Sequence, residues 1–225
     1  MPTVMITGAK RGIGRGLTDR FLEAGWDVIA AGRQIAEAEV AKLDGVSTVD
    51  LELADDHSIN AAAAALSGRP IDLLVNNAGV SNHMNSALGT ISRDGWLTEL
   101  SVNTVAPIFV TRALLPNLRM GSRKQIAMMS SKMGSIADNA SGGSYIYRSS
   151  KAALNAALKS LSHDLSSDGF TCVTLHPGWV QTDMGGPSAA ITVDQSTTGL
   201  FAVLNNLSAD QNGGFYNFDG TELPW

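Results

Sequence analysis

The chain has 225 residues, of which 44% are hydrophobic and 16% are charged, and 23 of them are glycine. This length, with no segment that resembles a linker, predicts one domain spanning residues 1–225. The formal net charge of −5 and the scattered Lys and Arg residues argue against a nucleic-acid-binding surface. The single cysteine, Cys172, excludes an internal disulfide and fits a reducing compartment.

The N-terminal apolar run is too short for a signal peptide, and its positive charges follow the run instead of preceding it. No stretch approaches the roughly 20 apolar residues that a membrane helix needs. We therefore expect a cytoplasmic protein with a small-molecule substrate, without a membrane or nucleic-acid partner and without a metal.

Strand and helix patterns alternate along the chain. Short runs rich in β-branched residues predict strands, and longer segments with helical spacing predict helices between them. This alternation predicts right-handed crossovers and a doubly wound α/β fold, with a parallel sheet covered by helices on both faces. The predicted strands are 3–7, 27–31, 46–49, 71–76, 125–130, 170–175 and 215–220, and the predicted helices include 14–25, 58–67, 103–118 and 149–169.

The sequence TGAKRGIG, residues 7–14, follows the first predicted strand and opens the first helix. Gly8 permits a tight turn, Gly12 lets the backbone approach a pyrophosphate, and Gly14 lets helix and strand pack closely. The pyrophosphate would then lie on the amides at the start of the helix. A nucleoside-triphosphatase loop is disfavoured because no Gly-Lys-Ser/Thr ends the pattern. The segment predicts dinucleotide binding by Gly8, Lys10, Arg11, Gly12, Ile13 and Gly14.

The end of the second strand indicates which dinucleotide binds. An acidic residue there would accept a hydrogen bond from the ribose 2′-OH of NAD(H), whereas a 2′-phosphate needs cations. The strand is followed by Arg33, no carboxylate occurs until Glu37, and Arg11 in the glycine loop is expected to reach the same phosphate. We therefore expect NADP(H) in preference to NAD(H).

The stretch YIYRSSK, residues 145–151, brings two phenols close to an ammonium group. On an α-helix Tyr147 and Lys151 share a face, whereas Tyr145 points elsewhere. The ammonium is expected to lower the pKa of the Tyr147 phenol from its reference of about 10, which would make it a usable proton donor and acceptor. An amphipathic pair on a half-exposed face is the alternative.

The glycine loop, NNAG at 76–79, Asn103, a strand ending in serines and YRSSK occur in this order over the whole chain. The joint pattern resembles the short-chain dehydrogenase/reductase family. This resemblance implies a single-domain Rossmann fold with seven parallel strands, a nicotinamide cofactor and an Asn–Ser–Tyr–Lys tetrad. YIYRSSK, HPGWVQTDMGG and the ending FYNFDGTELPW are most similar to the C-factor and sniffer type subgroup, which contains carbonyl reductases and proteins named for signalling.

The resemblance implies a role for each tetrad residue in hydride transfer to a carbonyl. Tyr147 would protonate the carbonyl oxygen, and the Ser131 hydroxyl would hold it. Lys151 would lower the tyrosine pKa and hold the nicotinamide ribose. Asn103 would anchor a water that links Lys151 to solvent, although an asparagine that opens a helix is often only a cap.

Three serines compete for one of these roles. Ser131 stands three residues before Gly134, as is usual in the family, which selects it over Ser130 and Ser135. The sixteen residues from Ser131 to Tyr147 exceed the usual separation, so we expect a longer loop at 134–144. Serines at a strand end are also common turn formers, which leaves a structural role as the alternative.

Further cofactor contacts are implied by the resemblance. NNAG is expected to face the adenine ribose, and HPGWVQTDM at 176–184 is expected to approach the nicotinamide carboxamide, with His176 interpreted as structural. Beside the adenine we expect Glu52, with Asp50 as the alternative. These expected contacts are Glu52, Leu53, Asn77, Ala78, Gly79, Pro177, Gly178, Val180 and Thr182, together with Arg33, Tyr147, Lys151 and the glycine loop.

We therefore predict an NADP(H)-dependent oxidoreductase that transfers a hydride between nicotinamide and a carbonyl or secondary alcohol. The alternative is a dinucleotide-binding signalling or sensor protein with little turnover, motivated by the subgroup and by the short segment after Met184, where the family commonly has a longer substrate lid. A serine hydrolase using Ser131 and His176 is disfavoured because no Gly-x-Ser-x-Gly elbow occurs. We expect a homodimer or homotetramer, as in many family members, although the apolar helix faces concerned can equally cover the sheet.

Overall fold

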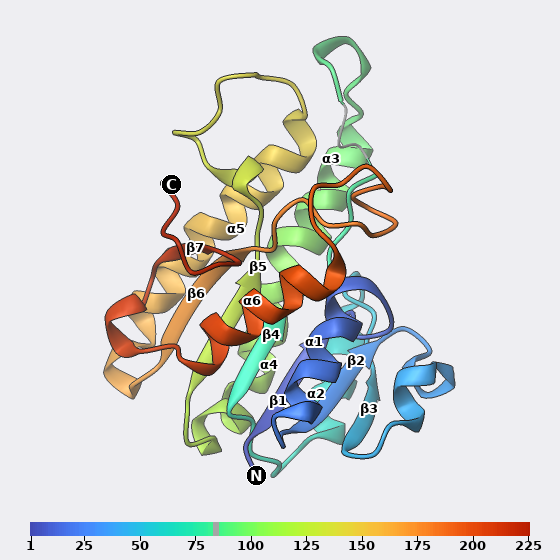
Figure 1. Cartoon of the computed structure of the whole chain (residues 1–225), viewed down its shortest axis with the longest axis vertical. Helices are drawn as coiled ribbons and strands as arrows, with labels where there is room; N and C mark the ends of the chain where they lie inside the picture. Colours follow the sequence, from blue (N-terminus) through green and yellow to red (C-terminus); the bar gives the residue numbers. More distant parts are fainter. Residues whose placement is uncertain (83–85) are drawn as a thin grey trace.

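The computed structural model describes residues 1–82 and 86–225 (Figure 1). Its core is a parallel sheet, which within the described residues has seven strands in the order β3-β2-β1-β4-β5-β6-β7. The predicted doubly wound α/β fold is therefore confirmed. The strands are β1 (Thr3–Thr7), β2 (Asp27–Gly32), β3 (Val46–Asp50), β4 (Leu73–Asn76), β5 (Gln125–Met129), β6 (Thr171–His176) and β7 (Phe215–Asn217).

The first strand of the sequence lies in the interior of the sheet. In β1, Met5 pairs with Ile29 of β2 on one side and with Leu74 of β4 on the other. All five residues of β1 are buried, as expected for a parallel strand with both faces covered. The chain thus winds outwards from β1 in one direction, and then returns to β4 and winds outwards in the other. Ligands of such sheets bind at this reversal point, outside the carboxyl ends of the strands.

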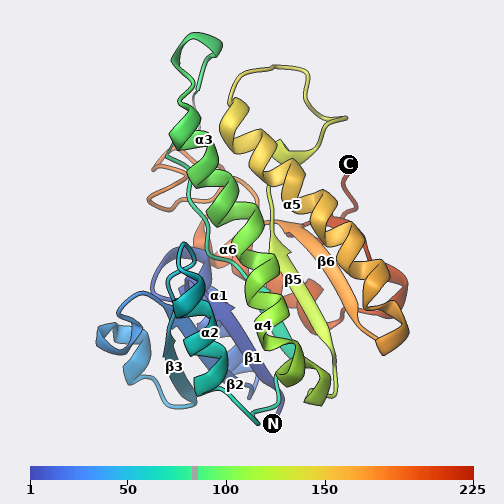
Figure 2. The same ribbon diagram turned by 180° about the vertical axis from the view of Figure 1, so that it is seen from behind.

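Helices cover both faces of the sheet (Figures 1 and 2). Leu17 and Leu200 help to fill the core under one helical layer, and Leu114 and Leu158 help to fill the core under the other. Burial of each such side chain contributes about 1.5–3 kcal/mol to folding. The first layer consists of α1 (Gly12–Glu23) and α6 (Val193–Asn205), and the second of α2 (Asp56–Ala65), α4 (Ala106–Met120) and α5 (Tyr145–Asp164).

One helical rod differs from its expected bounds. We expected a helix over 103–118 that Asn103 opens, but α3 (Arg93–Leu100) already begins at Arg93, where the Ser92 side chain accepts from Gly95 N. A π-helical segment, Ser101–Val105, joins α3 to α4, so the three form one continuous rod (Figure 2). Because α3 carries few apolar residues and an internal glycine, its sequence gives little helical periodicity.

Irregular segments gather at the carboxyl edge of the sheet. The expected long loop is present, because no helix or strand separates Gly134 from α5. Beyond β7 the chain returns to this loop, where the Trp225 carbonyl accepts from Ala137 N (2.9 Å) and Ser135 Oγ (3.2 Å).

Short 3₁₀ turns occur along the whole chain, at Ile35–Glu37, Glu39–Lys42, Leu88–Thr90, Lys132–Gly134, Ser166–Asp168 and Ala209–Gln211. Among the described residues, no helix is both long enough and apolar enough to cross a membrane.

Candidate active site

The glycine loop has the geometry for which its glycines were predicted. Gly8 and Gly12 have φ values of 69° and 55°, in the left-handed region that side chains disfavour. A Cβ added to Gly14 would lie 2.2 Å from the Gly8 carbonyl oxygen, so the turn closes on itself only with glycine there. The backbone of this loop forms a wall that a ligand can approach closely.

The first turn of α1 leaves amide groups available at this wall. Arg11 is the N-cap residue, but its side chain makes no capping hydrogen bond, and α1 begins at Gly12. The free amides and the positive end of the helix dipole suit the phosphates of a dinucleotide. The loop therefore offers backbone amides to an anionic group at this part of the cleft.

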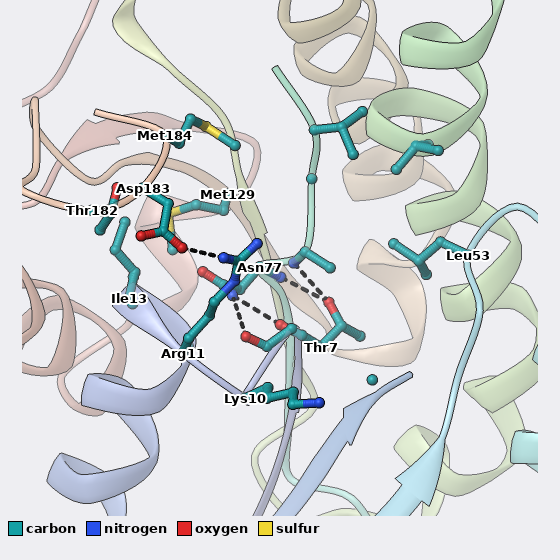
Figure 3. Close-up of a pocket in the computed structure, with 18 of the residues that line it drawn as sticks. Thr7, Lys10, Arg11, Ile13, Leu53, Asn77, Met129, Thr182, Asp183 and Met184 are labelled. Carbon is teal, nitrogen blue, oxygen red and sulfur yellow. Dashed lines mark hydrogen bonds and ion pairs between the residues drawn. The ribbon is translucent and has the colours of Figure 1, made fainter. Parts of the chain in front are cut away.

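Asn77 joins the ends of β1 and β4 in the wall of the cleft (Figure 3). Its Nδ2 donates to the Thr7 carbonyl at 2.9 Å, while the Thr7 hydroxyl accepts from the amides of Asn77 and Ala78, each at 3.0 Å. These bonds fix the NNAG segment beside the glycine loop. Gly79 follows at the level of the candidate catalytic residues, because a Cβ there would lie 3.4 Å from Lys151 Nζ.

A cleft of about 1580 Å³ runs along the carboxyl edge of the sheet, from Arg33 at one end to Tyr147 and Lys151 at the other. Two residues that we expected to contact cofactor, Gly178 and Val180, do not line it. Val180 is instead buried in a bridge with Ile191. The expected residues that line the cleft are Gly8, Lys10, Arg11, Gly12, Ile13, Gly14, Arg33, Glu52, Leu53, Asn77, Ala78, Gly79, Tyr147, Lys151, Pro177 and Thr182.

Sequence reasoning missed several lining residues. They include Gln34, Val80, Val102, Met129 and Met184. Most of them adjoin a predicted motif, as Val80 does after NNAG and Gln34 after Arg33. Their side chains belong to types that carry no distinctive chemistry, so adjacency is the signal that would have found them.

The two arginines assigned to a 2′-phosphate lie apart. Arg11 forms an ion pair with Asp183, across the cleft from its own loop (Figure 3). Arg33 lies 3.5 Å from a carboxylate oxygen of Glu52. Both arginines are thus paired with carboxylates, and Arg33 has an acidic neighbour although no carboxylate occurs near it in the sequence before Glu37. The acid comes from the end of β3, which is adjacent in space and distant in sequence.

The positions of Glu52 and Asp50 favour Glu52 as the candidate residue beside the adenine. Glu52 lines the cleft, whereas Asp50 accepts a hydrogen bond from Ile35 N at 2.9 Å and holds the turn after β2. Leu53 follows Glu52 along the same wall. Glu52 and Leu53 thus lie where the adenine was expected.

The competition among the three serines also has a structural answer. The Ser131 hydroxyl faces the Tyr147 phenol and lowers its pKa, and it also accepts a hydrogen bond from Met133 N at 3.2 Å. The Ser130 hydroxyl donates to Asn155 Oδ1 at 2.6 Å, and the Ser135 hydroxyl donates to the Trp225 carbonyl. Ser131 is therefore the serine that the fold brings to the tyrosine, although Ser130 and not Ser131 is among the residues that line the cleft.

Tyr147 and Lys151 lie one turn apart on α5 and are both buried. The Lys151 ammonium donates to the Met129 carbonyl at 2.9 Å and lies 5.9 Å from the centre of the Tyr147 ring. The half-exposed surface pair is thus excluded. Tyr145 is exposed at the start of the same helix, consistent with its interpretation as a neighbour.

The pKa of Tyr147 departs from its expected direction. Burial raises it to about 12, against the lowering effect of the Ser131 hydrogen bond and with a further rise from the Glu99 carboxylate. Burial lowers the pKa of Lys151 to about 8, and Glu99 opposes this change. The lowered phenol pKa that we expected is therefore wrong for the protein without cofactor, because desolvation dominates. At neutral pH Tyr147 is a protonated phenol.

Asn103 does not cap a helix. It lies in the π-helical segment and is fully buried, with Nδ2 2.8 Å from the Val80 carbonyl and Oδ1 2.8 Å from the Val80 amide. A third bond joins Nδ2 to Ser150 Oγ at 3.1 Å. Asn103 therefore holds the segment after NNAG against the helix that carries Tyr147 and Lys151.

His176 ends β6 and is not one of the residues that line the cleft. Burial lowers its pKa to about 4, and the positive charge of Lys132 contributes to the same direction. The imidazole is therefore neutral at ordinary pH. Its position next to the sheet supports the structural interpretation over an acid/base role.

This combination of a glycine loop at a sheet reversal and a buried Ser–Tyr–Lys cluster agrees with the family match. Residues 2–191 match the family described as short chain dehydrogenase, and the chain belongs to this family. The resemblance stated from the motifs is thus confirmed.

Individual relatives refine the comparison. The chain is 47% identical to the C-signal protein of Myxococcus xanthus over 156 residues, which cover 69% of this chain and 93% of that protein. The carbonyl reductase Sniffer of D. melanogaster superposes with a TM-score of 0.94 at 35% identity, with 100% of both chains covered. An NADPH-bound carbonyl reductase from chicken fatty liver superposes with a TM-score of 0.92 at 34% identity, covering 100% of this chain and 99% of that one.

Proposed function

We propose that the protein is an NADP(H)-dependent reductase of aldehydes or ketones, which also oxidises secondary alcohols when NADP⁺ is abundant. The observation that carries this proposal is that Ser131 lies beside the Tyr147 phenol, one helical turn from the buried Lys151, at one end of a cleft that the glycine loop also lines. The similarity to an NADPH-bound carbonyl reductase supports both the cofactor and the reaction.

We infer a role for the residues of the cleft from their positions. Bound NADPH would supply the hydride. The backbone of the glycine loop and the first amides of α1 would hold its phosphates, and Arg33 would face the 2′-phosphate once the ion pair with Glu52 opens. Lys151 would bind the nicotinamide ribose. Leu53 and the NNAG segment would line the adenosine part.

Proton transfer would run through Tyr147. The substrate carbonyl oxygen accepts hydrogen bonds from Ser131 and Tyr147, and the phenol delivers its proton as negative charge grows on that oxygen. A phenol that is protonated at neutral pH suits this direction. Asn103 would keep Lys151 connected to solvent through a bound water. Prepositioned groups of this kind contribute about 10²–10³ in rate each.

Substitution Tyr147→Phe tests the proposal. The variant keeps the buried ring and is expected to bind NADPH with nearly unchanged affinity while losing at least about 10²-fold in turnover of an aldehyde or ketone panel. Absorbance of NADPH measures turnover, and fluorescence titration measures binding. Unchanged turnover would contradict the assignment of Tyr147 as the proton donor.

A second function has a specific observation in its favour, which is the 47% identity to a protein called C-signal. In this alternative the chain binds the dinucleotide as a signalling or sensor protein and turns over little. Gly12→Asp places a side chain and a negative charge where the phosphates bind, so it should abolish cofactor binding. A biological effect that survives Tyr147→Phe but is lost in Gly12→Asp would favour this alternative over the reductase.

A further inference from the structure

The segment that carries Ser131, residues 130–134, lies directly against α5, the helix that carries Tyr147 and Lys151. A Cβ added to Gly134 would lie 2.8 Å from the backbone carbonyl carbon of Lys151. A side chain at position 134 would therefore push the segment away from the helix. The distance between Ser131 and Tyr147 thus depends on how closely this segment packs on α5.

One side chain of α5 bonds to both ends of this segment. Asn155 is 3% exposed and lies one turn beyond Lys151. Its Oδ1 accepts from Ser130 Oγ at 2.6 Å, and its Nδ2 donates to the Gly134 carbonyl at 3.4 Å. Ser130 immediately precedes Ser131, and Gly134 closes the turn that follows it. The Asn155 amide therefore holds the segment on both sides of Ser131.

An asparagine suits this position because its side chain carries both an acceptor and a donor. The hydroxyl on one side of Ser131 needs an acceptor, and the carbonyl on the other side needs a donor. The strand end is fixed separately, because Ser130 N donates to the Leu175 carbonyl at 2.7 Å. Loss of the Ser130 hydroxyl alone leaves the turn attached through Gly134, whereas loss of the Asn155 amide releases both ends.

We propose that Asn155 is a positioning residue, which holds the Ser131 hydroxyl at the distance from Tyr147 at which both bond to one substrate oxygen. The inference rests on the proposed function, in which Ser131 and Tyr147 share that oxygen. Asn155 is not among the described residues that line the cleft, so it acts through Ser131 and not on the substrate. Misplacement of a reacting group by about 1 Å is enough to cost about 10²-fold in rate.

The first test compares Asn155→Ala with a matched control, Asn117→Ala. Asn117 of α4 is also 3% exposed, and its Nδ2 donates to the carbonyls of Leu66 and Arg69 at 2.6 and 2.8 Å, away from the cleft. Both variants should unfold at lower denaturant concentration, because each leaves buried polar groups unpaired. Only Asn155→Ala is expected to lower kcat, by at least about tenfold, with the Kd for NADPH nearly unchanged. Equal kcat values in the two variants would overturn the proposal.

A double-variant cycle shows whether Asn155 acts through Ser131. In Ser131→Ala the hydroxyl that Asn155 positions is absent, so adding Asn155→Ala should lower kcat by less than about twofold more. If the two single losses multiply in the double variant, Asn155 acts independently of Ser131 and the proposal fails.

Gly134→Ala tests the same contact from the other side, and it keeps the proposal testable if Asn155→Ala does not fold. The added methyl group must displace the segment from α5. The variant should therefore also lose at least about tenfold in kcat, with the Kd for NADPH nearly unchanged. An unchanged kcat in Gly134→Ala contradicts the dependence of Ser131 on this packing.

Hydrogen exchange measures the contact without turnover. Met133 N donates to Ser131 Oγ at 3.2 Å, and Gly134 N donates to the Ser131 carbonyl at 2.7 Å. Both amides should exchange at least about tenfold faster in Asn155→Ala than in Asn117→Ala, because the turn opens locally more often. Equal exchange rates overturn the inference. If instead Tyr147→Phe keeps full turnover, the proposed function fails while hydrogen exchange still reports on the Asn155 contact.

Discussion

Adjacent serines at the end of β5 have opposite roles, although their side chains are chemically identical. Ser131 reaches the Tyr147 phenol, whereas the Ser130 hydroxyl is turned away to Asn155. Successive side chains leave a strand on opposite sides, so a shift of one position gives the two hydroxyls different partners.

This alternation predicts different defects for two single substitutions. Ser131→Ala removes a donor at the site and should lower kcat by about 10²-fold, and loss of its hydrogen bond from Met133 N should cost about 0.5–2 kcal/mol of stability. Ser130→Ala removes a buried hydrogen bond and should lower stability by about 1–3 kcal/mol while preserving most turnover. Steady-state kinetics and denaturant unfolding measure the two effects. Equal losses of turnover in both variants would contradict the assignment of Ser131.

Motifs predicted which residues form the site but not their charge states. Helical spacing predicted that Tyr147 and Lys151 share a face, and only the joint pattern of motifs made them and Ser131 candidates for the site. The direction of the Tyr147 pKa was mispredicted because it depends on burial and on Glu99, neither of which the local sequence reveals. The Arg33–Glu52 pair escaped prediction for a related reason, since adjacent strands bring it together.

At the scale of elements, α1 and the strand before it approach closely only because Gly14 lacks a side chain. The strands of the sheet were predictable because apolar β-branched runs are nearly continuous in a parallel sheet. Helix α3 was missed, since its eight residues RDGWLTEL offer few apolar positions, and its face is defined by contacts with α5. Bounds of helices thus depend on packing that periodicity does not record.

The close packing of Gly14 against the Gly8 carbonyl predicts that a substitution at Gly14 selectively weakens cofactor binding. In Gly14→Ala the new methyl group would lie 2.2 Å from the Gly8 carbonyl, so the loop must move. We expect affinity for NADPH to fall by at least about tenfold, because phosphate contacts depend on the loop backbone. Gly89→Ala, which meets nothing within 4 Å, is the matched control. Fluorescence titration that gave equal affinities for the two variants would exclude this role of the loop.

At the scale of the whole molecule, the cleft is lined by both halves of the fold. Arg33 and Leu53 belong to the half built from β1 to β3, whereas Tyr147, Pro177 and Thr182 belong to the half built from β4 to β7. A ligand that fills this cleft contacts both halves, and it binds the folded chain in preference to the unfolded one. Its affinity should therefore appear in global stability.

Thermal unfolding measures this linkage and the choice of cofactor together. At 100 times its Kd, NADPH should stabilise the fold by about 2.7 kcal/mol, which corresponds to a rise in Tm of roughly 5–10 °C for a chain of this size. NADH at the same concentration should give a smaller rise. Arg33→Ala should reduce the NADPH shift towards that of NADH, and Arg119→Ala, which loses a pair with Asp168 remote from the cleft, should not. A larger shift with NADH would reverse the cofactor assignment.

The interior position of β1 also has a consequence for how the chain reaches its fold. Val4 of β1 pairs with Leu73 of β4, so β1 and β4 can pair only after the chain between them has been synthesised. Pairings between such distant segments slow folding, because a long loop must close before the contacts stabilise it. During synthesis, β1 to β3 emerge first with one edge of β1 uncovered, and an uncovered strand edge promotes aggregation. The appearance of β4 is thus the step that closes this edge and commits the sheet to its final order.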